Sequence, residues 1–246
     1  MAASGSIREP DNIHASLMGK KKDYVGKKAF CLKHAVIFDL DGTLLNTLED
    51  LRSAVNAALS LRGLPPRSTE EVRQFVGNGI RNLMRRALPA GTEEAEIDAA
   101  LVDFKQYYGA HIHDSTVPYD GIPELLSSLR RRGIRIGVLS NKIDAASQQL
   151  IRHFFPGQTD VVFGEHEGIP RKPDPTSCKL VMEQLDVKPE EVLYVGDSGV
   201  DMQTANNAGL TAVGVTWGFR DREDLIQNGA DVLADEPAQI LDMLDR

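Results

Sequence analysis

Cysteine, long apolar runs and positive charge are all scarce in this chain. Its 246 residues include only Cys31 and Cys178, too few for a disulfide framework, so we expect two free, buried thiols. No apolar run approaches the roughly 18 residues of a membrane-spanning helix, and the N-terminus has no secretory signal. The net charge of −8 gives no basic surface for nucleic acid or an anionic membrane. We therefore expect a cytoplasmic protein with a small-molecule partner, and no feature of the sequence indicates its oligomeric state.

Residues 1–33 differ in composition from the rest of the chain. They are polar and carry a net charge of +4, so the remainder carries −12. A polar segment with few aromatic residues cannot bury enough apolar surface to fold, and this composition predicts a disordered leader.

From residue 119 onward, strand-like and helix-like stretches alternate. Apolar runs predict strands at 134–140, 160–163, 191–196, 211–216 and 231–234, and helices are expected at 121–132, 142–154, 175–186, 200–208 and 240–245. This alternation is typical of a doubly wound, Rossmann-like parallel sheet in an α/β protein.

Residues 47–118 contain no clear strand and predict helices at 48–61, 69–76 and 80–88 and a long helix ending near 110. Thr47 with Asp50, and Ser68 with Glu71, have the spacing of capping boxes. We therefore expect an α/β core domain formed by residues 34–46 and 119–246, into which an α-helical cap domain of residues 47–118 is inserted.

The most informative stretch is residues 35–43, Ala-Val-Ile-Phe-Asp-Leu-Asp-Gly-Thr. Four apolar residues predict a strand buried on both faces, and it ends directly in two acids. Because side chains alternate along an extended chain, Asp39 and Asp41 are expected on the same side, where open α/β sheets bind ligands. Ordinary turn chemistry is the alternative interpretation of Asp, Gly and Thr at this junction.

Polar residues also follow three later strands. Ser140 and Asn141 end one strand and suit a phosphate, although Asn141 alone would also suit a helix N-cap. Lys172 lies between Arg171 and Pro173, where a lysine in isolation is more often solvated. Asp197 follows another buried strand and offers a hard oxygen ligand for Mg²⁺; Asp201 follows one turn later, at a spacing that also fits a capping box with Ser198.

The residues Val-Ile-Phe-Asp-Leu-Asp-Gly-Thr, together with these later strand ends, resemble the motifs of the haloacid dehalogenase superfamily, whose members are mostly Mg²⁺-dependent phosphatases. The resemblance implies that Asp39 is the nucleophile, that Asp41 is the general acid and base, and that Thr43 holds the phosphate or Asp41. It also implies phosphate binding by Ser140, Asn141 and Lys172. Mg²⁺ would be bound by Asp39, the backbone carbonyl of Asp41 and Asp197, with Asp201 acting through water.

Within the superfamily, Phe75 to Gly79, Leu83 to Leu88 and Val215 to Gly218 resemble the phosphoglycolate phosphatases, with Asn46-Thr47 as a departure near the expected cap hinge. This narrower resemblance implies hydrolysis of 2-phosphoglycolate, a small phosphomonoester with a second anionic group. We expect Gly77, Asn78, Gly79 and Arg81 to recognise that group, because exposed N–H groups and a guanidinium favour a carboxylate. A flexible turn with a solvated Arg81 is the alternative.

Four other functions are also considered. The reaction of a dehalogenase would leave Asp41 without a role, which disfavours this function. A mutase similar to β-phosphoglucomutase, or a broad sugar-phosphate phosphatase, would share the core motifs, and release of free phosphate separates a hydrolase from a mutase. A catalytically silent binding module is disfavoured because all the acids and Lys172 are present.

Overall fold

The computed structural model describes residues 32–77 and 79–244, so the expected leader lies almost wholly outside the described residues. Lys33 is nevertheless buried, and its ammonium donates to the Glu190 carbonyl at 2.7 Å and to Thr211 Oγ1 at 3.2 Å. The folded core therefore already includes Lys33.

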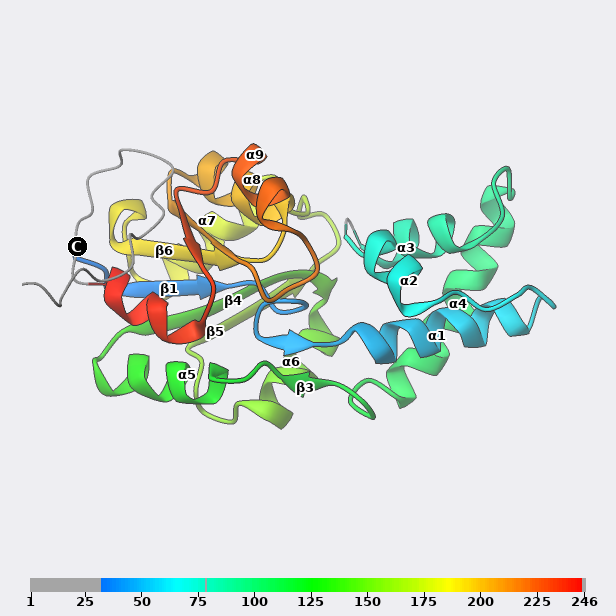
Figure 1. Cartoon of the computed structure of the whole chain (residues 1–246), viewed down its shortest axis with the longest axis horizontal. Coiled ribbons are helices and arrows are strands. Elements are labelled where there is room, and N and C mark those ends of the chain that lie inside the picture. The colour runs from blue at the N-terminus through cyan, green and yellow to red at the C-terminus, as the bar shows by residue number, and fades with distance from the viewer. Residues whose placement is uncertain (1–31, 78, 245–246) are drawn as a thin grey trace, which may run out of the picture.

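A six-stranded parallel sheet forms the centre of the core (Figure 1). The strands lie in the order β5-β4-β1-β6-β7-β8, and every neighbouring pair is parallel. Their bounds are β1 Ala35–Phe38, β4 Arg135–Ile143, β5 Val161–Glu165, β6 Val192–Gly196, β7 Thr211–Val215 and β8 Val232–Ala234. All five strands expected after residue 119 occur within a few residues of the predicted bounds, and the doubly wound fold is confirmed.

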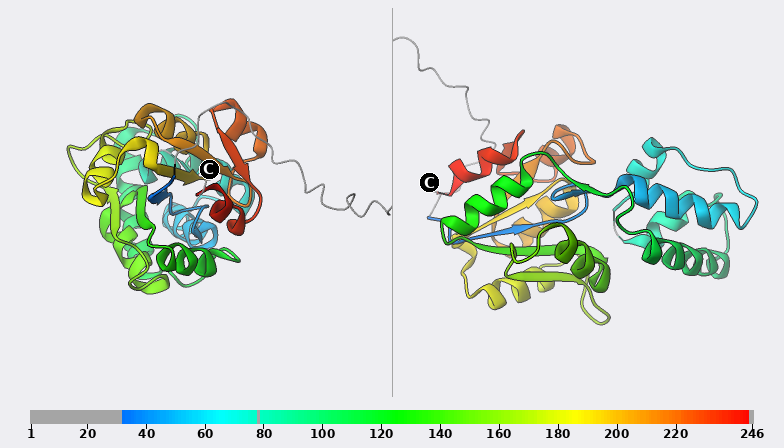
Figure 2. Two further views of the ribbon diagram at one scale, coloured as in Figure 1. Left: turned by 90° about the vertical axis from the view of Figure 1, so that its left-hand side faces the viewer. Right: turned by 90° about the horizontal axis from the view of Figure 1, so that it is seen from below.

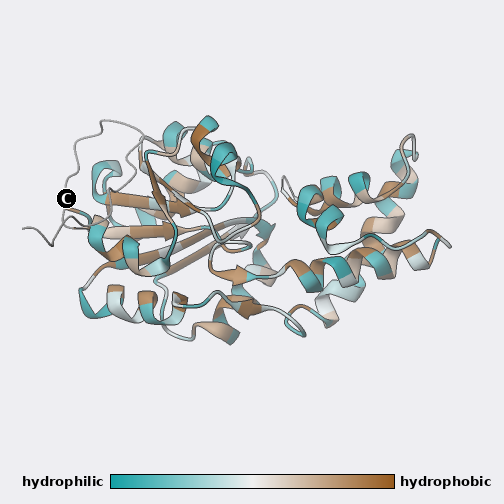
Figure 3. Cartoon of the chain, in the orientation of Figure 1, coloured by the Kyte–Doolittle hydropathy of each residue, from teal (hydrophilic) through white to brown (hydrophobic). Residues whose placement is uncertain are grey.

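Helices cover both faces of the sheet because the side chains of β1 alternate between two apolar clusters. Val36 and Phe38 pack with α5 (Ile122–Arg131), α6 (Asp144–Phe154) and the 3₁₀ helix η2 (Pro237–Met243). Ala35 and Ile37 pack with α7 (Thr176–Leu185), α8 (Gly199–Ala208) and α9 (Arg222–Gln227). Figure 3 shows the apolar strands between helices whose outer surfaces are polar.

Several expected bounds are wrong. The helix expected at 142–154 begins at Asp144, because β4 continues to Ile143 and pairs there with Glu165 of β5. The last helix is η2, which begins at Pro237 instead of residue 240, since proline favours a helical start. The short α9, capped by Asp221, and the 3₁₀ turn η1 (Pro189–Glu191) are too short to produce a periodic pattern.

Residues 48–110 form four helices that we call the helical insert: α1 (Leu48–Ser60), α2 (Thr69–Phe75), α3 (Ile80–Ala87) and α4 (Glu94–Ala110). α1 packs against α2 and α4, and α3 packs against the same two helices. The insert lies beyond the carboxyl ends of the sheet strands (Figures 1 and 2). Its two connections to the core form an antiparallel ribbon of β2 (Leu45–Asn46) and β3 (Val117–Pro118).

The two expected capping boxes have different outcomes. Ser68 and Glu71 form a complete capping box at the start of α2, as predicted. At α1 the prediction is wrong, because the Thr47 hydroxyl donates to Asp41 at 2.7 Å and Asp50 accepts from residues 115 and 116. Among the residues that the structure describes, no helix has the length and apolarity needed to span a membrane.

Candidate active site

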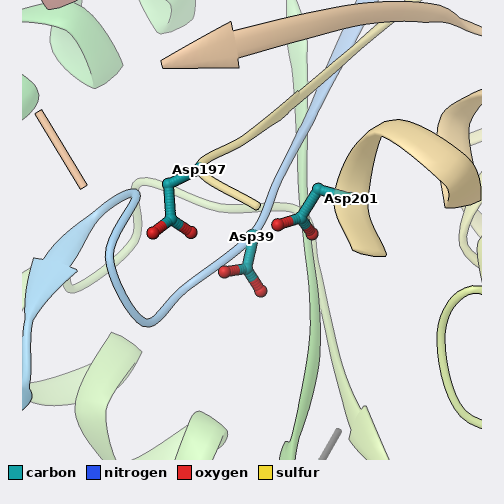
Figure 4. Close-up of side chains that lie close together, drawn as sticks. All are labelled: Asp39, Asp197 and Asp201. Carbon is teal, nitrogen blue, oxygen red and sulfur yellow. The ribbon is translucent and has the colours of Figure 1, made fainter. Parts of the chain in front are cut away.

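The register of the sheet brings three strand ends to one place. Phe38 of β1 is opposite Val138 of β4 and Val195 of β6, so the residues that follow these positions meet at the same edge. Asp39 directly follows β1, Asp197 directly follows β6, and Asp201 lies in the first turn of α8. Figure 4 shows the three side chains close together, and one oxygen from each lies within 4.8 Å of the others.

Lys172 joins this acidic cluster from the loop before α7. Its buried ammonium is 2.7 Å from Asp39 Oδ1, 2.7 Å from Asp201 Oδ1 and 3.0 Å from the Leu139 carbonyl. Asn141 fixes the lysine's backbone: its amide nitrogen donates to the Lys172 carbonyl at 3.1 Å, and its amide oxygen accepts from the Lys172 N–H at 2.9 Å. The interpretation of Asn141 as a helix N-cap is therefore wrong, since it lies inside β4.

The electrostatics of the cluster favour a divalent cation. Burial raises the pKa of the Asp39 carboxyl to about 7; Lys172 lowers that pKa and Asp201 raises it further. Burial, with Asp201 and Asp39 adding to its effect, places the pKa of Asp197 well above its usual range. When ionised, three carboxylates beside one ammonium leave two uncompensated negative charges, and carboxylate oxygens are the ligands of hard divalent cations. The residues present therefore fit such an ion.

Neighbouring backbone holds Asp197 and Asp201 in place. Asp197 Oδ2 accepts from the Phe219 N–H at 2.7 Å, and a Cβ on Gly42 would lie 2.3 Å from this oxygen. Asp201 Oδ2 accepts from the Ser198 N–H at 3.2 Å, as in a capping box at the start of α8, and it also accepts from the Ser198 hydroxyl at 2.6 Å. Asp201 therefore combines two interpretations left open by the sequence: it caps the helix and it faces the cluster.

Asp41 also faces the cleft but has different partners. Lys142 Nζ is 2.9 Å from Asp41 Oδ1 and 3.1 Å from Oδ2, and the Thr47 hydroxyl donates to Oδ1. Burial lowers the pKa of the Lys142 ammonium, but Asp41 and Tyr108 together outweigh this effect, so that the pKa lies above its usual value. Sequence reasoning missed Lys142 because it was assigned to a helix; its position directly after the strand-end pair Ser140-Asn141 was the available signal.

Thr43 does not hold Asp41, which is one of its two expected roles, and its contact with phosphate stays a prediction. It is fully buried, its hydroxyl donates to Asp197 Oδ1 at 3.4 Å, and its carbonyl accepts from Trp217 Nε1 at 3.0 Å. The hydroxyl that holds Asp41 belongs to Thr47 instead. The physical reason is the tight turn after Asp39, in which Gly42 has a φ of 91° and Leu44 and Leu45 bond back to the Leu40 carbonyl.

A cleft of about 690 Å³ lies between the core and the helical insert. The core side contributes Asp39, Asp41, Ser140, Lys142, Lys172 and Asp197, and the insert contributes Gly77, Gly79 and Arg86. Both glycines have a positive φ, 119° for Gly77 and 84° for Gly79, a backbone conformation that residues with a side chain rarely adopt.

The expected recognition loop is only partly at this cleft. Asn78 lies outside the described residues. Arg81 is paired with Glu94 at 2.6 Å and Asp98 at 2.8 Å on α4, and it does not line the cleft. The guanidinium groups at the cleft belong to Arg86 and Arg220, neither of which the sequence singled out.

Cys178 is buried, as expected, and burial raises the pKa of its thiol to about 12, which leaves it unreactive. Cys31 lies outside the described residues.

The chain is similar to known phosphatases along most of its length. The haloacid dehalogenase-like hydrolase family model matches residues 36–215. A phosphoglycolate phosphatase of Pseudomonas putida is 36% identical over 87% of this chain and 78% of its own, and N-acetylmuramic acid 6-phosphate phosphatase of Pseudomonas aeruginosa is 33% identical over 86% and 95%. The crystal structure of a predicted phosphoglycolate phosphatase from Haemophilus somnus has a TM-score of 0.80 and 29% identity, covering 86% of this chain and 97% of that one.

The family match includes Asp39, Asp41, Lys172, Asp197 and Asp201, which the fold brings to one edge of the sheet. The chain therefore belongs to the haloacid dehalogenase-like hydrolases, and within them it is a phosphatase that resembles the phosphoglycolate phosphatases.

Proposed function

We propose that this protein is a Mg²⁺-dependent phosphomonoester hydrolase that works through an aspartyl-phosphate on Asp39. The observation that carries the proposal is that two acids share one cleft and each is paired with its own lysine, Asp39 with Lys172 and Asp41 with Lys142. The rest of their surroundings differs, because Asp39 also has Asp201 beside it whereas Asp41 accepts from the Thr47 hydroxyl, and two carboxyl groups in different surroundings suit two different roles in one reaction.

The reaction has two steps. In the first, an Asp39 oxygen attacks phosphorus, the bond to the leaving oxygen breaks, and Asp41 gives that oxygen its proton. In the second, water attacks phosphorus, Asp41 takes a proton from the water, and the bond between phosphorus and Asp39 breaks. Free phosphate leaves, and both carboxyl groups return to their starting states.

The phosphoryl oxygens would be bound by Lys172, Ser140 and Asn141. Mg²⁺ would be held by Asp39, the Asp41 carbonyl and Asp197, with Asp201 acting through water, and when bound it offsets the repulsion between the carboxylates and the phosphate. Lys172 supports this arrangement because its ammonium already contacts Asp39, where the phosphoryl group would be transferred.

We propose 2-phosphoglycolate as the substrate. The two relatives are named for phosphoglycolate and for N-acetylmuramic acid 6-phosphate, and both molecules join a phosphomonoester to a carboxylate. Arg86 and Arg220 line the cleft and supply guanidinium groups suited to a carboxylate, the role that the sequence suggested for Arg81.

N-acetylmuramic acid 6-phosphate is a second candidate substrate. A cleft of about 690 Å³ is much larger than a two-carbon acid requires, and the relative named for this sugar phosphate aligns over 95% of its length. Both candidates contain the same two anionic groups, but the distance between those groups differs.

Phosphate release from three compounds tests the proposal: 2-phosphoglycolate, N-acetylmuramic acid 6-phosphate, and 2-hydroxyethyl phosphate, which lacks a carboxylate. We expect kcat/KM for one of the two carboxylates to exceed that for 2-hydroxyethyl phosphate at least about tenfold, and no turnover in excess chelator. Equal rates would contradict carboxylate recognition. Conversion of a sugar phosphate to its isomer without free phosphate would identify a mutase instead.

Arg86→Ala tests the carboxylate contact, and Arg81→Ala on the same helix is the matched control. We expect Arg86→Ala to lower kcat/KM for the preferred carboxylate by about tenfold, equivalent to 1.4 kcal/mol, with little change for 2-hydroxyethyl phosphate. Arg81→Ala should change kcat/KM for neither compound, because the ion pairs of Arg81 lie within the helical insert. A larger loss in Arg81→Ala than in Arg86→Ala would restore the original assignment.

A further inference from the structure

Lys142 is a buried cation that the proposed mechanism does not use. Its side chain is 4% exposed, and its ammonium lies within hydrogen-bond distance of both oxygens of Asp41, whose side chain is 17% exposed. A buried ammonium with both oxygens of one carboxylate as partners restricts the rotation of that carboxyl group.

The helical insert contributes to the same contact. The Lys142 ammonium lies 4.8 Å from the centre of the Tyr108 ring, and Tyr108 is a buried residue of α4. An aromatic face stabilises a desolvated ammonium at this distance. Thr47, immediately before α1, donates to the same Asp41 oxygen as Lys142. Asp41 is therefore held by Thr47, next to the start of the insert, and by Lys142 of β4, which in turn packs on Tyr108 near the end of the insert.

We propose that Lys142 is a positioning residue for Asp41 and that Tyr108 supports it, so that the general acid and base is fixed by a contact between the sheet and the helical insert. This inference rests on the proposed role of Asp41. Lys142 differs in this respect from Lys172, which contacts Asp39, the residue that would receive the phosphoryl group.

If Lys142 positions the general acid Asp41, the rate lost on removing Lys142 should depend on how much the leaving group needs a proton. p-Nitrophenyl phosphate and phenyl phosphate have similar shapes, but nitrophenolate is the better leaving group and needs a proton much less. Neither contains a carboxylate, so this comparison is independent of whether 2-phosphoglycolate is the substrate. In single-turnover measurements with Mg²⁺, we expect Lys142→Met to slow phenol release about ten- to a hundredfold, the usual effect of losing a supporting contact. Nitrophenol release should fall less than about threefold, and KM should change little.

A double-mutant cycle tests whether Lys142 acts through Asp41. In the Asp41→Asn background, the additional Lys142→Met substitution should lower phenol release less than about twofold, because nothing remains to be positioned. If Lys142 instead binds phosphate directly, the rate losses caused by Lys142→Met and Asp41→Asn will multiply in the double variant. Lys142→Met will then also slow the release of phenol and of nitrophenol equally. Either result would overturn the proposal. Full activity of Asp41→Asn alone would instead reject the proposed role of Asp41.

Measurements of Tm and a set of conservative substitutions distinguish a loss of Asp41 positioning from a general loss of structure. Lys142→Met leaves Asp41 without its cation, whereas the double variant removes both charges, so the double variant should have the higher Tm of the two.

The Tyr108 variants test the support from the helical insert. Tyr108→Phe keeps the ring and should retain the wild-type dependence of the rate on the leaving group. Tyr108→Leu removes the ring and should shift this dependence toward that of Lys142→Met. Lys105→Met, at an exposed position of α4, is the control and should behave as wild type. An unchanged leaving-group dependence in a folded Lys142→Met protein would overturn the inference.

Discussion

At the scale of single residues, the site depends on charges that are buried before any substrate arrives. Asp39, Asp197 and Asp201 are almost completely buried, and Lys172 is the ammonium that contacts two of them. Burying like charges in a medium of low dielectric constant is unfavourable unless a cation is close. Each substitution in this cluster should therefore change both reactivity and stability.

Asp39→Asn should abolish turnover because an amide of nearly the same shape is a far poorer nucleophile. We expect kcat to fall at least about a thousandfold, with unchanged far-UV circular dichroism. Steady-state phosphate release by a variant purified without wild-type enzyme measures this. Activity near the wild-type level would reject Asp39 as the nucleophile.

The same variant should change the pH dependence of stability in metal-free protein. The pKa of Asp39 is about 7 in the fold and about 4 in an unfolded chain, so the folded state binds more protons between these values. Its contribution to stability is complete below pH 4 and is lost as the pH rises through 7. We expect Tm in chelator to fall more between pH 5 and pH 8 for wild type than for Asp39→Asn. An equal fall in both proteins would contradict the raised pKa of Asp39.

Asp197 and Asp201 should differ in their effect on Mg²⁺. Asp201 is bound by Ser198 and the Lys172 ammonium, whereas Asp197 accepts from the Phe219 N–H and, at 3.4 Å, from the Thr43 hydroxyl, neither of which is a cation. We therefore expect Asp197→Ala to raise the Mg²⁺ concentration for half-maximal activity more than Asp201→Ala does, by about tenfold. A Mg²⁺ titration of both variants checks the order, and equal shifts would show that Asp201 also binds the ion directly.

At the scale of elements, residues with the same local sequence pattern serve different purposes. Ser68 and Thr47 both precede helices and both have an acid three residues later, but only Ser68 forms a capping box. The hydroxyl of Thr47 is used by Asp41, and Asp50 ties the start of α1 to the chain returning to the core. A capping pattern therefore does not show whether the hydroxyl caps a helix or serves the site.

Ser68→Ala and Thr47→Val should separate these roles. Loss of the Ser68 cap should lower the free energy of unfolding by about 1 kcal/mol without changing kcat. Thr47→Val removes one hydrogen bond to a charged carboxyl group, worth about 1.5 kcal/mol, and should lower kcat by about tenfold. Urea unfolding and steady-state kinetics measure the two effects, and a reversed pattern would contradict the observed contacts.

At the scale of the whole molecule, the core and the helical insert meet across the cleft. Arg220, from the loop after β7, donates to the Arg73 carbonyl at 2.8 Å and the Val76 carbonyl at 2.5 Å, at the end of α2. The contact of Lys142 with Tyr108 and the ribbon of β2 and β3 (Figure 2) also join the two parts. The position of the insert over the site therefore depends on a few polar contacts.

Arg220→Met should loosen the insert while keeping most of the side-chain length. We expect a larger radius of gyration in solution scattering without substrate and a severalfold higher KM for 2-hydroxyethyl phosphate, which has no carboxylate for Arg220 to bind, since part of the binding energy must then be used to close the cleft. Arg222→Met, whose ion pair with Asp235 lies within the core, is the control. An unchanged radius and KM would show that Arg220 does not hold the insert.

The sequence by itself determined the sheet, the order of its elements along the chain and the ends of β1 and β6, at which Asp39 and Asp197 lie. These features follow from local patterns: an unbroken apolar run predicts a buried strand, and in a parallel sheet its end places Asp39 or Asp197 at the ligand edge. The long amphipathic helix α1 and the apolar strand β6 were accordingly predicted almost to the residue.

Only the tertiary structure decided which side chains share a contact. Lys142 is 101 residues from Asp41 along the chain, and Arg81 turned toward α4 while Arg86 faced the cleft. Such pairings depend on the packing of several elements at once, including the extension of β4 to Ile143 and the fold of the insert. A periodic pattern identifies the face of an element, but the partner of a charge is set by whichever distant group the fold brings within a few ångströms.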